Sequence, residues 1–153
     1  MEKTLVIIKP SAVQRQLIGE IIGRFENKGL LLFGLKMIWL SDDVLNEHYA
    51  HLKNKPFFGQ LKKSMEATPV IVCCWAGNNA VSVVRTISGA TNGREALPGT
   101  IRGDYSVSVQ ENIIHTSDSV ENATEELKRF FKEEELFSYQ PLLLSSIYGN
   151  DEI

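Results

Sequence analysis

The first apolar segment of the chain runs from Thr4 to Pro10 and reads TLVIIKP. A β-branched and aliphatic run of this length is typical of a buried strand, and the proline ends it because its nitrogen cannot donate to a strand ladder. Ser11 and Gln14 follow with capping-box spacing, and Lys28-Gly29 is a later stop signal. Between them, apolar side chains recur at helical spacing, at Val13, Leu17, Ile18, Ile21, Ile22 and Phe25. These residues predict a strand followed by one helix.

Three further segments have the composition of strands, namely Leu30 to Leu40, Val70 to Ala76 and Asn112 to Thr116. Gly34 lies inside the first of them, where a glycine indicates a bulge or a close approach of another part of the chain. Cys73 and Cys74 are neighbours in the second, so their side chains point to opposite faces and are expected to be buried, reduced thiols. An adjacent cysteine pair alone matches no zinc pattern.

Helical segments separate these strands. Ser41-Asp42-Asp43 is expected to cap a helix with Val44, Leu45, His48, Tyr49 and Leu52 on one side. Pro56 is expected to start a second short helix that carries Phe57, Phe58, Leu61 and Met65, so that the two form a helical hairpin. Asn78 or Asn79 should cap a third helix, which ends at Gly89. Ser117, Asp118 and Glu121 should cap the last helix, with Val120, Ala123, Leu127, Phe130 and Phe131 facing inward.

Without the hairpin, the order of elements is strand, helix, strand, strand, helix, strand, helix. This order predicts an α+β fold, a ferredoxin-like βαββαβ sandwich with an antiparallel sheet and helices on one face. Residues 90–110 show no sustained period, which indicates either a wrong assignment or a functional loop. The C-terminal extension from Phe137 to Ile147 is apolar, so part of it is expected to pack on the domain.

The length and the charge of the chain limit the classes of protein to which it can belong. The 153 residues are enough for one domain, expected to span residues 1–153, with 43% hydrophobic and 23% charged residues. The net charge is -3 and the basic residues are scattered, which argues against nucleic acid as the main ligand. No apolar run reaches the length of about 20 residues that a membrane span needs, and no signal peptide is evident. A cytoplasmic protein is expected.

Phosphate-binding motifs are missing, since the sequence contains neither GxxxxGK[ST] nor GxGxxG nor the protein-kinase loops. Basic and hydroxyl groups instead lie at the ends of predicted elements around the long loop, at Lys9, Arg85, Thr91 and Arg102. Together these groups could clamp phosphates. Each alone is equally well explained as a solvated charge or as part of a turn.

His115 lies between the apolar Ile113-Ile114 pair and the predicted start of the last helix. A histidine beside a core is often a hydrogen-bonded structural residue. However, a neutral imidazole is also a good nucleophile, and backbone amides at a helix start favour an incoming anion. Glu126 lies about two turns into that helix, from where its carboxylate can reach a ring nitrogen and fix the tautomer. Nucleophile and orienting carboxylate form the pattern of covalent catalysis.

The segment from Asn112 to Ser119 reads NIIHTSDS, and with it the whole chain resembles the nucleoside diphosphate kinases. The resemblance covers about nine tenths of the chain without an apparent gap. Further matching segments are Ile8–Pro10, Gln14-Arg15, Gly19–Ile22, Arg24–Glu26, Lys28-Gly29, Glu47–Tyr49, Lys53, Pro56–Phe58, Thr91-Asn92 and Pro98–Asp104.

The resemblance implies a ping-pong reaction in which a nucleoside triphosphate gives its γ-phosphoryl group to His115 and a second nucleoside diphosphate takes it back. It implies that Glu126 and Ser117 support His115, and that Phe57 stacks on the base. Phosphates and sugar would be held by Lys9, Tyr49, Arg85, Thr91, Arg102 and Asn112. Mg²⁺ would bind mainly through the nucleotide phosphates, so no protein ligand is assigned. A homo-oligomer is implied, with a hexamer favoured over a tetramer.

The chain departs from the family pattern at a few positions. They are Ser11-Ala12, His51, Gly93-Arg94 and Gln110-Glu111. None removes a proposed phosphate or histidine contact, but Gln110 could change the packing of the loop beside the base. Two alternatives stay open: a ferredoxin-like nucleotide- or RNA-binding module without catalysis, and a relative that has lost its chemistry. The first lacks support from paired strand aromatics and a basic surface.

Overall fold

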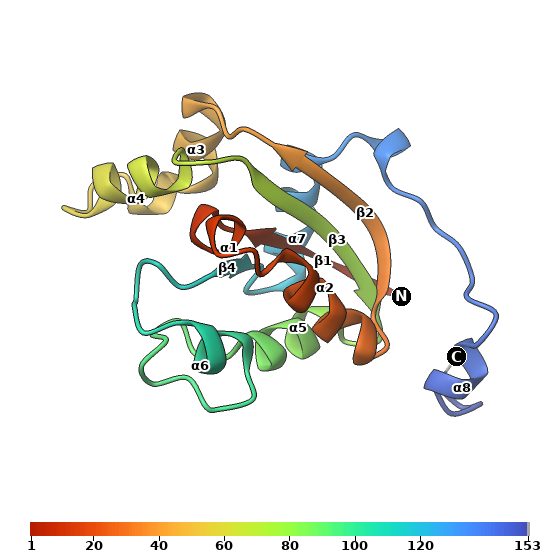
Figure 1. Cartoon of the computed structure of the whole chain (residues 1–153). Helices are drawn as coiled ribbons and strands as arrows, with labels where there is room; N and C mark the ends of the chain where they lie inside the picture. The colour runs from red at the N-terminus through yellow and green to blue at the C-terminus, as the bar shows by residue number, and fades with distance from the viewer. Residues whose placement is uncertain (153) are drawn as a thin grey trace.

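An antiparallel sheet with the strand order β2-β3-β1-β4 forms the centre of the computed structural model, which describes residues 1–152 (Figure 1). Its strands are β1 (Glu2–Ile8), β2 (Leu31–Ile38), β3 (Val70–Gly77) and β4 (Ile114–Thr116). The helices are α1 (Pro10–Gln14), α2 (Ile18–Asn27), α3 (Asp42–His48), α4 (Phe58–Met65), α5 (Ala80–Ser88), α6 (Ile101–Tyr105), α7 (Val120–Phe130) and α8 (Leu144–Ile147). Two 3₁₀ turns, η1 (Ala50–Leu52) and η2 (Glu133–Glu135), complete the order. The ferredoxin-like α+β fold and the inserted hairpin α3–α4 are confirmed.

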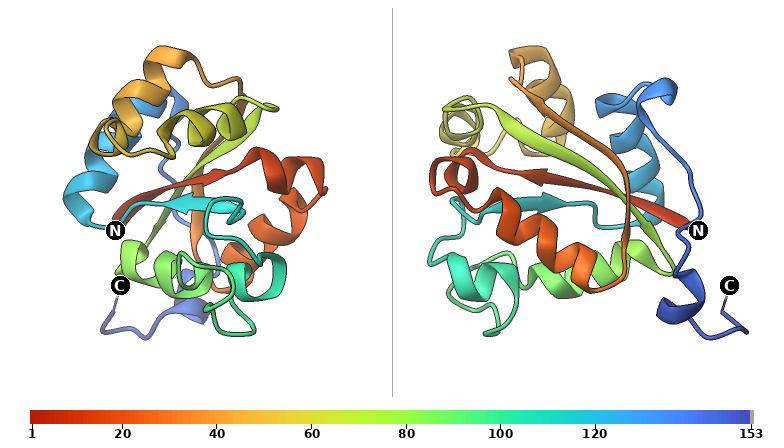
Figure 2. Two further views of the ribbon diagram at one scale, coloured as in Figure 1. Left: turned by 90° about the vertical axis from the view of Figure 1, so that its left-hand side faces the viewer. Right: turned by 45° about the vertical axis from the view of Figure 1, so that its right-hand side comes forward.

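The expectation that helices cover only one face of the sheet is wrong. Helices α2 and α5 pack on one face and α7 packs on the other (Figure 2). Along β1, Leu5 and Ile7 belong to the core on the α7 side, whereas Val6 and Ile8 belong to the core on the α2 side. Because both faces of β1 and β3 are buried, these strands show continuous apolar runs rather than alternation.

The single helix predicted after the first strand is two helices, α1 and α2. Gln16 has a φ of 58°, in the left-handed region, which ends α1 and redirects the chain. Ser11 does not cap the helix, because Pro10 is its first residue and Lys9 occupies the N-cap position. Apolar spacing continues through the break, so the pattern contained no sign of it.

Gly34 meets both of its predicted roles. The pairing of β2 with β3 shifts register between Leu32 and Gly34, which marks a bulge. A Cβ at Gly34 would lie 2.8 Å from Cδ2 of Leu136, so the chain also approaches closely here. The bulge thus lets the segment after α7 pass over the edge of the sheet.

The start of α7 differs from the prediction. Ser119, rather than Ser117, is the N-cap residue and accepts a hydrogen bond from the amide of Asn122. Val120 is 47% exposed and does not face inward. This arrangement leaves the hydroxyl of Ser117 available to a different partner. Asn79 precedes α5 as predicted, but its side chain makes no capping hydrogen bond.

The two irregular segments also contain structure. Residues 90–110 include the short helix α6, which is capped by the side chain of Thr100. The C-terminal extension leaves the sheet edge where the amide of Phe137 donates to the carbonyl oxygen of Phe33, then runs to α8 (Figure 1). Leu144 is buried there, while Leu142 is 99% exposed. Part of the extension packs on the domain, as expected.

Candidate active site

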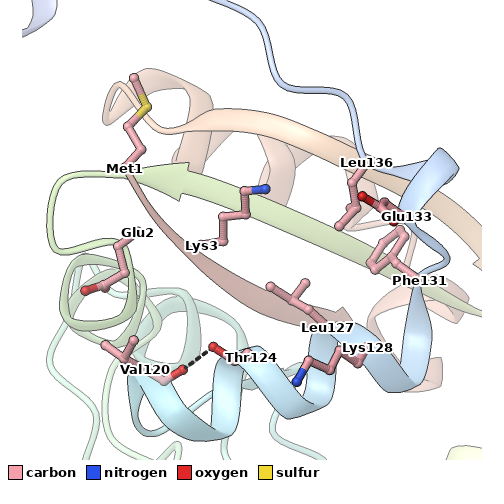
Figure 3. A pocket seen from close by; sticks show the side chains of 10 residues that line it. All are labelled: Met1, Glu2, Lys3, Val120, Thr124, Leu127, Lys128, Phe131, Glu133 and Leu136. Carbon is pink, nitrogen blue, oxygen red and sulfur yellow. Dashed lines mark hydrogen bonds between the residues drawn. The ribbon is translucent and has the colours of Figure 1, made fainter.

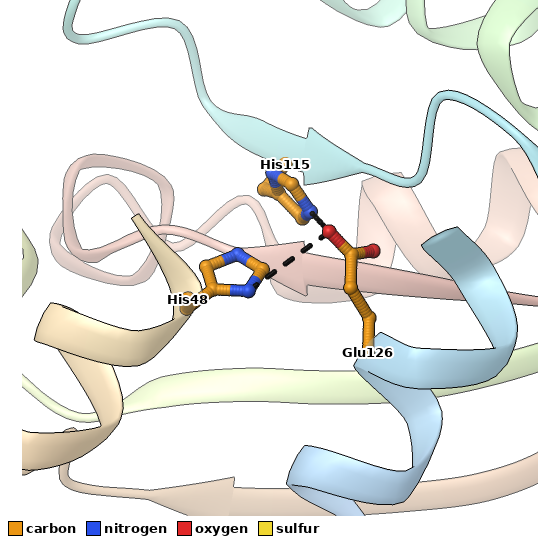
Figure 4. A group of neighbouring side chains, drawn as sticks. All are labelled: His48, His115 and Glu126. Atoms are coloured by element: carbon orange, nitrogen blue, oxygen red, sulfur yellow. Dashed lines mark hydrogen bonds and ion pairs between the residues drawn. The ribbon is translucent and has the colours of Figure 1, made fainter. Parts of the chain in front are cut away.

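His115 projects from β4, a short edge strand paired with β1 opposite Ile7. Its Nε2 atom lies 3.0 Å from Oε1 of Glu126, which rises from α7 (Figure 4). Since a carboxylate only accepts hydrogen bonds, the neutral ring carries its proton on Nε2 and has its free lone pair on Nδ1. The predicted pairing of His115 with Glu126 is therefore present, and it leaves the lone pair of Nδ1 without a partner from Glu126.

Ser117 holds the other oxygen of the same carboxylate. Its hydroxyl donates to Oε2 of Glu126 at 2.5 Å and accepts from the backbone amide of Leu5 at 3.3 Å. Burial acts to raise the pKa of Glu126, but hydrogen bonds and charge from His115 and the bond from Ser117 outweigh it, so that the pKa is lowered. The carboxylate is thus ionised and fixed at both oxygens, as an orienting group must be.

A connected polar cluster lies beside β4 and consists of Lys9, Asn112 and Arg102. Lys9 Nζ donates to Asn112 Oδ1 at 2.6 Å, and Asn112 Nδ2 donates to the carbonyl oxygen of Thr91 at 3.0 Å. Arg102 donates to the carbonyl oxygens of Gly89, Asn112 and Ile114. These bonds tie the strand before His115 to the long loop.

Burial disfavours the charged forms of Lys9 and Arg102 and so lowers the pKa of each. It lowers the pKa of Lys9 to about 8, with a further decrease from the positive Arg102 and a smaller opposing effect of Glu111. Burial and then the positive Arg85 lower the pKa of Arg102 to about 10. Positive charges brought together in a partly desolvated site favour an anionic ligand. Arg85 itself is exposed on α5 and lines a hollow of about 400 Å³ with Gly89 and Thr100.

A cleft of about 410 Å³ adjoins this cluster. It is lined by Lys9, Tyr49, Leu52, Phe57, Leu61, Thr91, Val109, Gln110 and Asn112. Five of the seven predicted nucleotide-binding residues therefore share one cleft. Tyr49 connects the cleft to His115, because the ring centroids of Tyr49 and His115 are 6.3 Å apart. Arg85 and Arg102 do not line this cleft; Arg102 reaches its wall through the carbonyl of Asn112.

Sequence reasoning missed two groups at this site. Val109 lines the cleft together with Phe57, and only its position three residues before Asn112 pointed to it. His48 was placed on one side of the hairpin and in the matching segment Glu47–Tyr49 but was given no role, yet its ring centroid lies 4.5 Å from that of His115 (Figure 4). Its side chain is 2% exposed, and burial followed by the nearby His115 lowers its pKa to about 3. His48 is therefore neutral.

His48, His115 and Glu126 have donor atoms within 4.8 Å of one another, the kind of grouping that can hold a metal ion. A guanidinium argues against this use, since Arg129 Nη1 lies 3.3 Å from His48 Nδ1 and occupies the side from which an ion would bind. Two imidazoles are also unsuitable for Mg²⁺, which prefers oxygen ligands.

The larger cavity, of about 540 Å³, lies elsewhere, between the start of β1 and α7 (Figure 3). None of the predicted site residues lines it. Its walls come from Met1, Glu2, Lys3, Val120, Thr124, Leu127, Lys128, Phe131, Glu133 and Leu136. Size alone would have indicated the wrong surface, whereas the predicted nucleotide-binding residues and the nearby imidazole of His115 indicate the smaller cleft. In residues 1–152, no helix has the length and apolar character needed to span a bilayer.

Comparisons with known proteins indicate one family. A family model described as nucleoside diphosphate kinase matches residues 2–136. A nucleoside diphosphate kinase of Parabacteroides distasonis is 66% identical over 152 residues, 99% of each chain. Nucleoside diphosphate kinase A of Rattus norvegicus is 50% identical and covers 96% of this chain and 97% of its own. The structure of a halophilic nucleoside diphosphate kinase from Halobacterium salinarum in complex with CDP has a TM-score of 0.93 at 39% identity, covering 96% of this chain and 98% of that chain.

Fold and site together define a ferredoxin-like α+β phosphotransferase, with an imidazole–carboxylate pair near a cleft that contains the ammonium group of Lys9. Within that class, the chain belongs to the nucleoside diphosphate kinase family. The resemblance seen in the sequence is confirmed, and the reading as a binding module without catalysis is not supported.

Proposed function

We propose that the chain transfers the γ-phosphoryl group of a nucleoside triphosphate reversibly to a nucleoside diphosphate through a phosphohistidine on His115. The observation that carries this proposal is the 3.0 Å contact between His115 Nε2 and Glu126 Oε1. It leaves the Nδ1 lone pair free to act as a nucleophile. The carboxylate stabilises the positive charge that the ring acquires as it attacks.

The reaction has two matching halves. In the first, Nδ1 forms a bond to the γ-phosphorus, the bond from that phosphorus to the bridging oxygen breaks, and the diphosphate leaves with the electron pair. In the second, a terminal phosphate oxygen of another diphosphate attacks the same phosphorus and the nitrogen–phosphorus bond breaks. The proton on Nε2 stays in its bond to Glu126 throughout. Phosphoryl transfer needs positioning and charge stabilisation above all, which Lys9, Arg85 and Arg102 supply.

Tyr49 adds a neutral donor to the cleft. Its hydroxyl is buried and has no hydrogen-bond partner among residues 1–152. Burial and the nearby Glu126 raise its pKa, so the phenol stays protonated. A buried donor without a partner is costly, and a phosphate oxygen would satisfy it. Thr91 and Asn112 would hold sugar and phosphate oxygens in the same cleft.

Phe57 is 45% exposed at the mouth of the cleft and is proposed to stack on the base. Every base has a π face, so stacking accepts purines and pyrimidines alike, whereas contacts to base edges would discriminate. Broad use of nucleotides follows from this arrangement.

Mg²⁺ is proposed to accompany the nucleotide. The cleft offers an ammonium group, an amide and hydroxyls rather than paired carboxylates, so its donor set fits an ion that nucleotide phosphates and water hold. We assign no protein ligand. When bound, the ion would neutralise negative charge on the phosphates.

A homo-oligomer, with a hexamer favoured over a tetramer, is part of the proposal, as is a cytoplasmic location. Support for assembly comes from apolar side chains of the C-terminal extension, where Leu142 is 99% and Leu143 is 68% exposed. A neighbouring subunit would bury them. Light scattering tests this part: the mass of six chains is expected, four chains would replace the hexamer by a tetramer, and one chain would overturn assembly.

Incubation with γ-labelled ATP tests the central reaction. Label should stay on the protein, resist base, be lost in acid, and pass to added GDP or CDP without release of inorganic phosphate. His115→Ala should take up no label. If the chain were a binding module without catalysis, the unaltered protein would take up no label. If His115→Ala took up label normally, the nucleophile would be another residue, with Ser117 the first candidate.

A further inference from the structure

His48 lies close to two side chains of α7 whose spacing would allow an ion pair. Glu126 and Arg129 are three residues apart on one helix, a spacing at which opposite charges form ion pairs. They do not bond to each other here. Glu126 binds His115 and Ser117, while Arg129 donates to Glu47 Oε1 at 2.8 Å and contacts His48 Nδ1 at 3.3 Å.

The tautomer of His48 follows from its contact at Nδ1, because Nε2 is buried and has no hydrogen-bond partner among residues 1–152. Arg129 only donates hydrogen bonds, so His48 Nδ1 accepts and the ring proton lies on Nε2. The distance from that Nδ1 to Glu126 Oε1 is 3.9 Å, beyond a hydrogen bond. The imidazole therefore binds the guanidinium without binding the carboxylate, although its Nδ1 atom lies close to both.

Packing fixes the ring in this place. Tyr49 and Phe130 contact it edge-on, with ring centroids 4.6 Å and 5.1 Å away. His115 lies on a further side at 4.5 Å, also edge-on. A ring held on three sides in this way cannot turn aside to let Arg129 approach Glu126.

We propose that His48 is a positioning residue for phosphoryl transfer, a neutral spacer that keeps Arg129 from capturing Glu126 and so keeps Glu126 on His115. Without the ring, the guanidinium would draw the carboxylate away, and Nδ1 of His115 would lose its fixed orientation. The inference rests on the proposed role of His115. It adds a residue that touches no substrate and acts through Glu126.

Four variants test the spacer. His48→Ala should lower kcat by about 10- to 100-fold with KM within about twofold, as expected for a misplaced nucleophile. His48→Gln should keep most of the activity, because its amide oxygen can accept from Arg129. The double variant His48→Ala/Arg129→Ala should recover most of the lost kcat, since no cation then competes for Glu126. His51→Ala, a histidine exposed on the same hairpin, is the matched control and should behave as the unaltered protein.

Two outcomes would overturn the proposal: an unchanged kcat in His48→Ala, or a loss that the added Arg129→Ala does not relieve. The second outcome would show a purely structural role, which a lowered Tm in both variants would accompany. ¹⁵N NMR of the histidines gives an activity-independent test, also usable if His48→Ala does not fold. The proposal expects His48 protonated on Nε2 alone, and a proton on its Nδ1 would contradict it. If the unaltered protein forms no phosphohistidine, the proposed function fails while this tautomer result still stands.

Discussion

Lys9 donates a 2.6 Å hydrogen bond to Oδ1 of Asn112, a residue 103 positions further along the chain. The bond joins the end of β1 to the strand that carries His115, and it presents a buried ammonium group to the cleft. The pKa of about 8 that results from burial makes this contact sensitive to pH.

Nucleotide affinity should therefore fall above pH 8. A lysine with a lowered pKa is charged below that value and neutral above it, and a bound phosphate favours the charged form. The Kd of ADP should rise by up to about tenfold per pH unit above pH 8. Calorimetric titration from pH 7 to 9.5 measures it. Lys9→Met should bind weakly at every pH with a flat profile, and an equal rise in that variant would assign the effect to another group.

Substitution of Arg102 and substitution of Arg85 should differ in their effects on the free energy of unfolding. Both substitutions by alanine should lower turnover by roughly 10² to 10³, about 3 to 4 kcal/mol, because each removes a charge from the developing negative centre. Only Arg102→Ala should also lower the free energy of unfolding, by about 2 to 4 kcal/mol, since it leaves three backbone carbonyls without their donor. Denaturant titration at fixed protein concentration decides this. Equal stability of the two variants would contradict the structural role of Arg102.

Glu126→Gln should lower kcat by about tenfold, less than either arginine variant. The amide keeps an oxygen for one neighbour but loses the charge that stabilises the phosphorylated ring. Rapid-quench measurement of phosphoenzyme formation isolates this step. A loss as large as that of His115→Ala would mean that the carboxylate has a direct part in the chemistry.

Phe57→Ala should raise KM by a similar factor for purine and pyrimidine nucleotides, about 5- to 150-fold, because it removes one stacked ring worth about 1 to 3 kcal/mol. Steady-state assays with GDP and CDP as acceptors measure the effect. Phe57→Leu offers a control that keeps apolar area without a π face. A loss confined to one base would instead indicate contacts to base edges, for which Gln110 is the nearest candidate in the cleft.

The sequence predicted the sheet and the helices well because both rest on local apolar spacing. It could not show the break at Gln16, since the helical period continues from Val13 to Leu17 and only the backbone angle changes. The prediction that all helices lie on one face of the sheet was wrong. Continuous apolar runs in β1 and β3 indicate that both faces of these strands are buried, but they do not show which helix covers each face.

At the site, the pairing of His115 with Glu126 was predictable because His115 lies just before α7 and Glu126 lies about two turns into that helix. No role was predicted for His48, because its contact with Arg129 joins residues 81 positions apart in the chain. The capping role expected of Ser117 failed for a related reason: its hydroxyl bonds to Glu126 and Leu5, and Ser119 caps α7 in its place.

The location of the phosphoryl group on the protein tests the central claim most directly. ³¹P and ¹⁵N NMR of the ¹⁵N-histidine-labelled protein after reaction with ATP and Mg²⁺ should show one phosphorus bonded to Nδ1 of His115, with the proton retained on Nε2. Phosphorus on Nε2, or on any residue other than His115, would contradict the assignment of nucleophile and orienting carboxylate.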